Sequence, residues 1–452
     1  MALQIDDYLA ELDWRGLLHQ TTGGDALREH LANPAQSPRI AYCGFDPTAD
    51  SLTIGNLIPI MMLVHLARAG HTPVMVSGGG TGMIGDPSGK SAERQLQTID
   101  RVAANTEAQR GIFDRVFSNL GLRTPEVVNN LDWLGELTFL DALRDIGKHF
   151  SVNMMVQKDS VRERLHNREQ GISYTEFSYM LLQAYDFAYL HETRGVTIQA
   201  SGSDQYGNIV AGIDLIRKRA AAEADDPEGV ETHAYAVTAP LVTKADGTKF
   251  GKTESGAIWL SAPGPGEAVD TPARTSAYAY YQFWLNASDA DVGRFLRLYT
   301  VLDREAIESL EATHAEAPGK REAQRTLARE ATRILHGEAA RDQAEAAARA
   351  LFSGEVVGLS EETLEAVFAD VPSSAHDKAS LDGGGVPLAE LLPETSLAKS
   401  RREAREFLSN GSVSVNGQKV DAERSLGTGD LLHGSTIALR RGKKSWHVTR
   451  WR

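Results

Sequence analysis

The strongest constraint on the fold is a recurring pattern in which a short apolar run ends in glycines and a helical stretch follows. The runs RIAYCGF, TPVMVSGGG and GVTIQASGSDQYG have this form, and LIPIMMLVHLARAG between the first two has helical spacing. Strands that alternate with helices favour a parallel sheet with helices on both faces. Ligands of such sheets bind at the carboxyl ends of the strands. We therefore expect an α/β domain with its site at these glycine clusters.

Composition narrows the class of protein further. Of the 452 residues, 42% are hydrophobic and 24% are charged, as in ordinary globular proteins. The N-terminus, MALQIDDYLAELDWRG, is acidic and amphipathic, which is not typical of a signal peptide, and no apolar run reaches the roughly 18 residues of a membrane span. The single cysteine, Cys43, excludes an intrachain disulfide and any multi-cysteine metal site. We expect a cytoplasmic protein without a bound metal.

Charge is distributed unevenly along the chain. The net charge is −14, but residues 397–452 contain 12 Lys and Arg against five Asp and Glu, a net of +7, so the preceding residues carry −21. Between these parts, residues 275–352 are rich in Ala, Glu and Arg, and residues 353–390 are acidic and loop-rich. In the tail, the stretch GSVSVNGQKV predicts a β-hairpin that turns at Asn416-Gly417. A basic tail on an acidic body indicates contact with a nucleic acid or another anionic surface.

Two nucleotide-binding motifs are matched only formally. Gly80-Thr-Gly82-Met-Ile-Gly85 has the spacing of a dinucleotide-binding turn, but Asp86-Pro87 follows where a helix should continue, so we do not expect a nicotinamide cofactor. GDPSGKS, which begins at Gly85, has one residue too few between its glycines for a P-loop.

Five segments taken together resemble the bacterial tyrosyl-tRNA synthetases, which are class I aminoacyl-tRNA synthetases. They are YCGFDPTADSLTIGNL, GDPSGKSAER, YTEFSYMLLQAYD, QASGSDQYGN and KADGTKFGKT, in this order. The resemblance implies a Rossmann-like catalytic domain (1–240), a signature loop and connector (241–274), an α-helical anticodon-binding domain (275–352), an acidic linker (353–390) and an S-four-like RNA-binding domain (391–452). It also implies a homodimer that joins L-tyrosine to tRNA(Tyr) with ATP as substrate, and Mg²⁺ that arrives with the ATP.

The chemistry of this family explains which residue types the sequence contains. The tyrosine carboxylate attacks the α-phosphate of ATP, and pyrophosphate leaves. Because the carboxylate is already ionised at neutral pH, no Ser-His or Cys-His pair is needed. Positioning and positive charge at the phosphates suffice.

The two class I signatures are present in variant forms. The first, usually His-Ile-Gly-His, reads Thr53-Ile54-Gly55-Asn56, in which Thr53 is shorter than histidine and never cationic. The second reads Lys249-Phe250-Gly251-Lys252-Thr253 and follows an Asp-Gly turn, so we expect it on an exposed loop. The resemblance implies catalytic roles at the phosphates for Thr48, Thr53, Asn56, Lys249, Lys252 and Thr253.

The resemblance also assigns the substrate contacts. Tyr179, Gln183 and Asp186 are spaced i, i+4, i+7, so a helix would present them on one face. A buried Asp186 would be costly without a hydroxyl partner, which would favour tyrosine over phenylalanine. The implied tyrosine-binding residues are Tyr42, Asp86, Tyr179, Gln183, Asp186 and Gln205. The implied ATP-binding residues are Cys43, Gly44, Asp46, Gly55, Gly202, Asp204 and Lys252.

The tail resembles a small RNA-binding module shared with a ribosomal protein. Lys399, Arg401, Arg402 and Arg405 fall on its short helix and are expected to neutralise RNA phosphates. Two alternatives stay open at this point. One is a weakened homologue that only binds RNA, which Thr53 favours and the lysines of the second signature oppose. The other is a tryptophanyl-tRNA synthetase, which the Tyr42 and Asp186 pair and the basic tail oppose.

Overall fold

The computed structural model describes residues 4–32, 34–35, 37–85, 97–158, 161–162, 172–227, 230–248, 250–253, 256–264, 267, 271–368, 371–442 and 445–452. The chain forms two compact units. The first holds Met1–Ser261 and Ala287–Leu335, and the second holds Ala262–Asn286 and His336–Arg452. In the described part of the chain, no helix is both long and apolar enough to cross a membrane.

The first unit is built on a six-stranded sheet in the order β1-β6-β5-β2-β3-β4. All neighbouring strands are parallel except β1, which runs antiparallel to β6. This confirms the α/β fold class predicted from the alternating pattern. The strands are β1 (Gln20–Thr21), β2 (Ile40–Phe45), β3 (Thr72–Ser77), β4 (Glu126–Asn129), β5 (Val196–Gly202) and β6 (Tyr235–Ala239).

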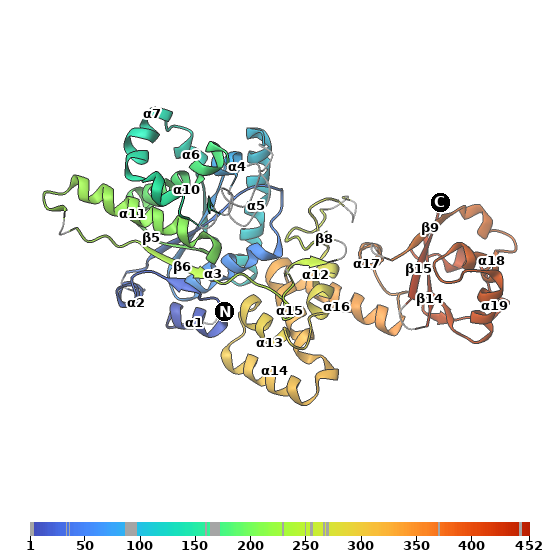
Figure 1. The fold of residues 1–452 in the computed structure, drawn as a ribbon. Helices are drawn as coiled ribbons and strands as arrows, with labels where there is room; N and C mark the ends of the chain where they lie inside the picture. Colours follow the sequence, from blue (N-terminus) through green and yellow to red (C-terminus); the bar gives the residue numbers. More distant parts are fainter. Residues whose placement is uncertain are drawn as a thin grey trace. The chain divides into compact units, whose positions relative to one another are not determined.

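Helices cover both faces of this sheet. The chain passes from β2 to β3 through α3 (Leu57–Arg68) and from β5 to β6 through α11 (Tyr206–Glu223), in opposite directions across the sheet. Right-handed crossovers therefore place α3 and α11 on opposite faces. Helix α10 (Tyr174–Arg194) starts at Ser173, whose side chain accepts from the Glu176 N–H, and ends at Gly195 in the left-handed region. It packs beside α11 (Figure 1).

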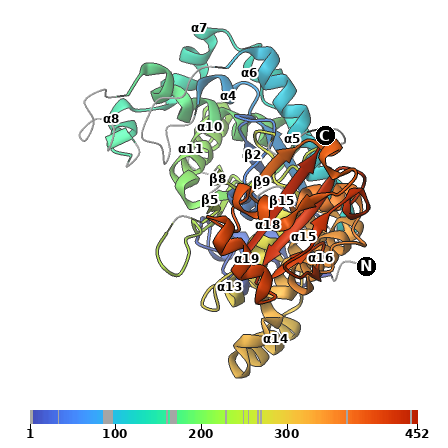
Figure 2. The same ribbon diagram turned by 90° about the vertical axis from the view of Figure 1, so that its right-hand side faces the viewer.

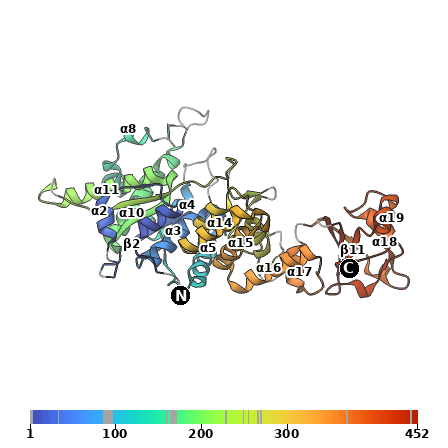
Figure 3. The same cartoon turned by 90° about the horizontal axis from the view of Figure 1, so that it is seen from below.

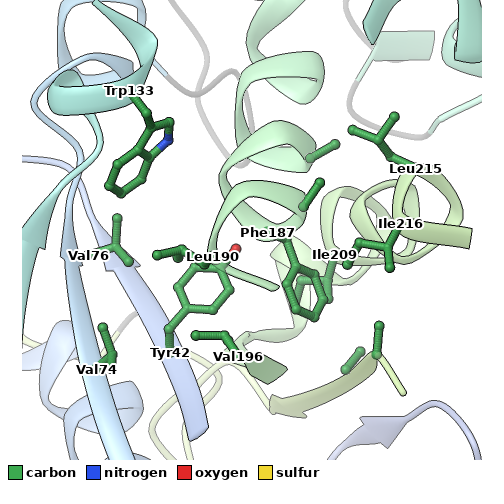
Figure 4. Packing of buried hydrophobic residues seen from close by; sticks show 14 of the residues in the cluster. Tyr42, Val74, Val76, Trp133, Phe187, Leu190, Val196, Ile209, Leu215 and Ile216 are labelled. Atoms are coloured by element: carbon green, nitrogen blue, oxygen red, sulfur yellow. The ribbon is translucent and has the colours of Figure 1, made fainter. Parts of the chain in front are cut away.

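The core under α10 and α11 fixes the position of strand β2. Tyr42 and Val76 point from the sheet toward Phe187 and Leu190 of α10, with Ile209 of α11 behind them (Figure 4). The remaining helices used below are α1 (Tyr8–Arg15), α4 (Thr81–Ile84), α6 (Leu131–Leu134), α7 (Phe139–Asp141), α8 (Val152–Met155), α13 (Val292–Tyr299), α14 (Arg304–Glu316) and α15 (Glu322–His336).

The second unit contains a five-stranded sheet in the order β12-β11-β14-β15-β9. Figure 2 shows β9 beside β15, and Figure 3 shows α18 and α19 next to β11. Helices α18 and α19 cover one face, while α16 and α17 pack on the other against Ala438 and Trp446. The elements are α12 (Ala277–Leu285), α16 (Glu338–Ser353), α17 (Glu361–Val367), β9 (Ser373–His376), α18 (Leu388–Leu391), α19 (Arg401–Ser409), β11 (Val413–Val415), β12 (Gln418–Lys419), β14 (Thr436–Arg441) and β15 (Ser445–Trp451).

Two sequence expectations can be compared with this unit. The predicted hairpin is confirmed: β11 pairs antiparallel with β12, and Asn416 and Gly417 both have positive φ, at 49° and 87°, as a tight hairpin turn requires. The segment 353–390, expected as a linker with some helix, contains α17 and also β9, an edge strand of the sheet. The helical segment expected over 275–352 is shared, because α13 to α15 belong almost entirely to the first unit and α12 and α16 to the second.

Candidate active site

A cavity of about 710 Å³ lies at the carboxyl ends of β2, β3 and β5. Strand β2 is the point where the strand order reverses, since β3 adjoins it on one side and β5 on the other. Loops that leave such neighbouring strands in opposite directions open a crevice, which is where ligands of these sheets bind. Asp46 after β2, Gly78 after β3 and Gly202 at the end of β5 line its rim.

The cavity brings together the sequence-predicted site residues of this unit whose side chains are described. Asp86 and Lys249 lie outside the described residues. For Lys252 and Thr253 the structure describes only the backbone, which forms β7 (Lys252–Thr253) and pairs with β8 (Gly256–Ala257). The predicted residues in the cavity wall are Tyr42, Cys43, Gly44, Asp46, Thr48, Thr53, Gly55, Asn56, Tyr179, Gln183, Asp186, Gly202, Asp204 and Gln205.

One end of the cavity is built around a buried carboxylate. Asp186 is 5% exposed, and its Oδ1 accepts a hydrogen bond of 2.7 Å from Trp133 Nε1. Its Oδ2 accepts one of 2.9 Å from Asn130 Nδ2. The Tyr42 hydroxyl is buried and has no hydrogen-bond partner within the described part of the chain. A buried polar group without a partner is costly, so this end is suited to a ligand hydroxyl.

Electrostatics at this end favour a neutral hydrogen-bonding ligand. Burial raises the pKa of Asp186 to about 7, the hydrogen bonds from Asn130 and Trp133 act in the opposite direction, and the nearby Asp46 adds to the rise. Burial, followed by the charge of Asp186, raises the pKa of Tyr42 well above its ordinary value. A ligand hydroxyl that donates to Asp186 would favour its ionised form.

A chain of hydrogen bonds connects this end to the loop after β2. Asn130 Nδ2 donates to Thr81 Oγ1 (3.0 Å) as well as to Asp186. Thr81 Oγ1 donates in turn to Asp46 Oδ1 (2.8 Å). Asp46 Oδ2 accepts from the Tyr179 hydroxyl (3.2 Å). Asn130 thereby fixes the orientation of the carboxylate relative to the rest of the cavity.

The amide side chains on the helical wall have defined orientations. Asn208 Nδ2 donates to Gln183 Oε1 (3.0 Å) and to Gln205 Oε1 (3.2 Å). Gln205 Nε2 donates to Asp204 Oδ2 (3.2 Å). Gln183 Oε1 has a second lone pair, so it can still accept a hydrogen bond from a ligand donor.

The first signature begins the helical turn before α3. Asn56 Oδ1 accepts from both the backbone N–H and the hydroxyl of Thr53, each at 3.0 Å. The donor that Asn56 can offer a ligand is therefore its Nδ2 group. Gly55 is exposed at the start of this turn, so its backbone is accessible to a ligand. The start of a helix favours anions.

The second signature is joined to the first through the main chain. The Ile54 N–H donates to the Ile258 carbonyl (2.9 Å), and the Ile258 N–H donates to the Gly251 carbonyl (3.0 Å). One further bond runs from Leu260 N–H to the Leu52 carbonyl (2.8 Å). These bonds fix the backbone of both signatures side by side at the mouth of the cavity.

The remaining wall combines small residues with one carboxylate. Gly44 and Asp204 are exposed to the cavity, whereas the Cys43 thiol is buried and lies 3.7 Å from the Gly44 carbonyl. Burial raises the pKa of Cys43 to about 12, so the thiol is neutral at physiological pH. Asp204 is the group on this wall that can accept hydrogen bonds from ligand hydroxyls.

Sequence reasoning missed Asn130, Trp133, Thr81 and Asn208. The first two follow β4, at the edge where the cavity forms, and the pair Asn129-Asn130 at a strand end was a usable signal. Thr81 and Asn208 lie in short motifs already singled out for other residues, and nothing in the local pattern distinguishes them.

The basic residues predicted on the tail helix are all exposed. Lys399 precedes Ser400, the N-cap of α19, and Arg401, Arg402 and Arg405 lie on the helix. Arg401 comes within 3.8 Å of the exposed Glu390 carboxylate, a pairing that water screens strongly. These cations are accessible to a polyanion.

Comparison with known proteins identifies the family. Residues 34–353 match the model of class I tRNA synthetases for tryptophan and tyrosine, and residues 363–449 match the SYY-like C-terminal domain of tyrosine–tRNA ligases. The chain is 48% identical over 450 residues to a tyrosine–tRNA ligase of Bacillus caldotenax. The aligned residues are 98% of this chain and 100% of that relative. A tyrosine–tRNA ligase of Roseiflexus castenholzii is 47% identical over 445 residues, which are 98% of this chain and 99% of that one.

Solved structures agree with this assignment. A C-terminally truncated mitochondrial tyrosyl-tRNA synthetase of Coccidioides posadasii superposes with a TM-score of 0.62 at 31% identity, over 75% of this chain and 91% of that chain. The chain belongs to the class I tRNA synthetases, and within them to the tyrosine–tRNA ligase family.

Proposed function

We propose how this tyrosine–tRNA ligase activates its amino acid. The substrate phenol lies between Tyr42 and Asp186, and the α-ammonium lies near Tyr179 and Gln183, with Asp86 and Gln205 completing the tyrosine contacts. The carboxylate then faces ATP across the cavity, and it attacks the α-phosphate so that pyrophosphate leaves. The observation that carries this proposal is the buried, doubly hydrogen-bonded Asp186 near a Tyr42 hydroxyl that has no hydrogen-bond partner among the described residues.

The same pair accounts for selection against phenylalanine. A substrate without the hydroxyl would leave Tyr42 unpaired and Asp186 short of a donor in a dry environment. Tyrosyl-tRNA synthetase is itself the usual example of this kind of discrimination. Tryptophan, with a larger ring system and its N–H elsewhere, does not place a hydroxyl between the two groups.

The phosphates of ATP bind at the two signatures. Thr48, Thr53 and Asn56 contact the phosphate chain as hydrogen-bonding groups, while Lys249, Lys252 and Thr253 supply charge and a donor as pyrophosphate develops. Mg²⁺ is a hard cation, and it enters bound to phosphate oxygens of ATP. The ribose and adenine lie along Cys43, Gly44, Asp46, Gly55, Gly202 and Asp204.

The direct test is ATP–pyrophosphate exchange with tyrosine, tryptophan and phenylalanine in parallel. We expect exchange that depends on tyrosine and is far weaker with the other two amino acids. If none of the three amino acids supports exchange, the proposed activation step is wrong. If exchange is faster with tryptophan than with tyrosine, the assignment of the pocket to tyrosine is wrong.

We propose that the helical segment and the tail bind tRNA(Tyr). A hollow of about 440 Å³ beside α13 and α14 is lined by small and apolar residues together with the polar side chains of Asp289, Arg294, Glu311 and His314, which can form hydrogen bonds to the edge of a nucleobase. On the tail, Lys399, Arg401, Arg402 and Arg405 neutralise phosphates. Replacing these four with Gln should impair tRNA charging, with a flatter salt dependence, and spare exchange. Intact charging would remove the tail from the mechanism.

We propose that two copies of the chain associate through an apolar surface between residues 139 and 154. Its exposed side chains include Phe139 (66% exposed), Leu140 (75%) and Met154 (66%), an unusual density for a surface in contact with water. A Leu140→Glu substitution should convert a dimer into a monomer in sedimentation velocity. A wild-type protein that sediments as a monomer at micromolar concentration would contradict this.

We place the enzyme in the cytoplasm, where tRNA charging takes place.

A further inference from the structure

The second signature contains an aromatic residue whose ring is held by a helix of the helical segment. The Phe250 ring stacks on Tyr299, with centroids 5.3 Å apart and planes at 22°. It also contacts Phe295 at 5.0 Å. Phe295 and Tyr299 are four residues apart on α13 and are 4% and 0% exposed, so they present one buried aromatic face. Such ring pairs are favourable beyond the area they bury.

The residue after Phe250 packs directly on the first signature. Gly251 has a φ of +81°, and a Cβ at this position would lie only 2.5 Å from Cγ2 of Ile54. Any larger residue would therefore force Ile54 or the backbone at Gly251 to shift, and it would be strained at this positive φ. The Gly251 carbonyl also accepts a hydrogen bond from the Ile258 N–H. The Ile258 carbonyl in turn accepts one from the Ile54 N–H. The backbone of Phe250 and Gly251 is thus fixed on two sides.

The helix that holds Phe250 is itself anchored to the body of the unit. Arg15 is fully buried at its side chain and donates to the carbonyls of Arg297 and Thr300, each at 3.0 Å, and of Leu302 at 2.6 Å. The Arg297 carbonyl lies in the last turn of α13, and those of Thr300 and Leu302 follow the helix. Carbonyls at a helix C-terminus need donors from outside the helix, and Arg15 supplies them. Helix α13 also packs on α3, the helix that continues from the first signature. The hydrogen bonds from Arg15 and the packing on α3 together fix α13 relative to the first signature.

We propose that Phe250 is a positioning residue for adenylate formation, and that α13 acts through it. The aromatic contact with Phe295 and Tyr299 sets the backbone of the second signature against Ile54. Lys249 and Lys252 are the sequence neighbours of Phe250 and Gly251, so a displaced backbone at these two residues would displace both lysines. This inference rests on the proposed phosphate-binding role of the two lysines.

The experiment compares Phe250→Ala and Phe295→Ala with a matched control in steady-state ATP–pyrophosphate exchange. Each variant should lower kcat about tenfold, which corresponds to about 1.4 kcal/mol in the activation barrier. The KM for tyrosine and the Kd of tyrosine in equilibrium dialysis should stay within twofold, because the tyrosine end is untouched. The double variant should lose little more than either single one, since both remove the same contact. Phe295→Tyr, which keeps the ring, should restore most of kcat.

The control is Ile307→Ala, a change in a fully buried residue of the neighbouring helix α14. It destabilises the helical segment without removing a ring from this contact, so kcat should stay near the wild-type value. If Phe250→Ala lowers kcat no more than Ile307→Ala at a similar loss in Tm, or if it raises the KM for tyrosine in parallel, the positioning role is wrong. Lys252→Ala separates the two levels of the argument. If Lys252→Ala leaves kcat unchanged, the proposed phosphate site fails, whereas a large effect of Lys252→Ala with none of Phe250→Ala refutes only the inference about Phe250.

Discussion

The two ends of the cavity are built in different ways. At the proposed tyrosine end the side chains come from the interior of regular elements, Tyr42 from β2 and Asp186 from α10, and both are buried. At the proposed phosphate end, Thr48 lies in the loop after β2 and Gly55 in the short helical turn Ile54–Asn56; both are exposed, and main-chain hydrogen bonds form the frame. A dry, rigid environment makes an unmet hydrogen bond costly, which serves selection. An accessible site that presents donors and charge serves the leaving group.

The largest predicted effect is that of Asp186→Ala on the use of tyrosine. The variant loses the acceptor for the phenol and leaves donors of Asn130 and Trp133 unpaired, so kcat/KM for tyrosine should fall at least about 100-fold. Thermal unfolding should change far less, because burial of the Asp186 charge is itself unfavourable. A loss of stability as large as the loss of activity would show that Asp186 is structural.

A smaller effect is expected when Asp186 keeps its carboxyl group but loses one donor. Trp133→Phe removes the Nε1 hydrogen bond while keeping an aromatic ring to stack on Tyr189, whose centroid is 4.8 Å away. The loss of one charge-assisted bond predicts a roughly tenfold rise in the KM for tyrosine with kcat nearly unchanged. If Trp133→Phe lowers kcat and leaves the KM for tyrosine unchanged, Trp133 affects the reaction step and not the binding of tyrosine, which would contradict this prediction. Tyr189→Leu serves as the control for lost stacking.

Local patterns predicted the parts of this site that a single element determines. The spacing of Tyr179, Gln183 and Asp186 identified one helix face, because side-chain direction in a helix follows from sequence separation alone. The same holds for the hairpin at Asn416-Gly417, where two positive φ angles demand these residue types.

The contacts that the sequence did not reveal join distant elements. Asn130 is 56 residues from Asp186 in the sequence. Phe250 contacts Phe295 of α13, although a loop and the segment Ala262–Asn286 of the second unit separate the two in the sequence. Which side chain of one element reaches which side chain of another depends on crossover paths and packing, and no local periodicity encodes them. The division of the helical segment between two units has the same origin, since contacts rather than composition decide it.

The pH dependence of tyrosine binding should distinguish the ends further. Because burial raises the pKa of Asp186 to about 7 in the free enzyme, its carboxylate is increasingly protonated as the pH falls from 8 to 6. A protonated carboxyl is a poorer acceptor for the phenol, so the Kd of tyrosine should rise up to about tenfold over this range. The Kd of Asp186→Asn should be flat there. A flat wild-type profile would mean that Asp186 stays ionised throughout.

The smallest effect is expected at the first signature. Thr53→His restores a longer side chain that can carry charge, so kcat of exchange should rise a few-fold while the KM for tyrosine stays constant. The loss of the Thr53 hydroxyl bond to Asn56 should lower stability by about 1 kcal/mol. A change in tyrosine KM would show that the two ends are not separable at this residue.

The central claim is that the tyrosine end determines which amino acid is used and the phosphate end determines how fast it reacts. The most direct measurement is the ratio of kcat/KM for tyrosine to that for phenylalanine in ATP–pyrophosphate exchange, in wild type, Asp186→Asn and Lys252→Ala. We predict that the ratio falls by at least about tenfold in Asp186→Asn. In Lys252→Ala, kcat/KM should fall by the same factor for tyrosine and for phenylalanine, so their ratio should stay at the wild-type value. A ratio that survives Asp186→Asn, or that falls in Lys252→Ala, would contradict this division of roles.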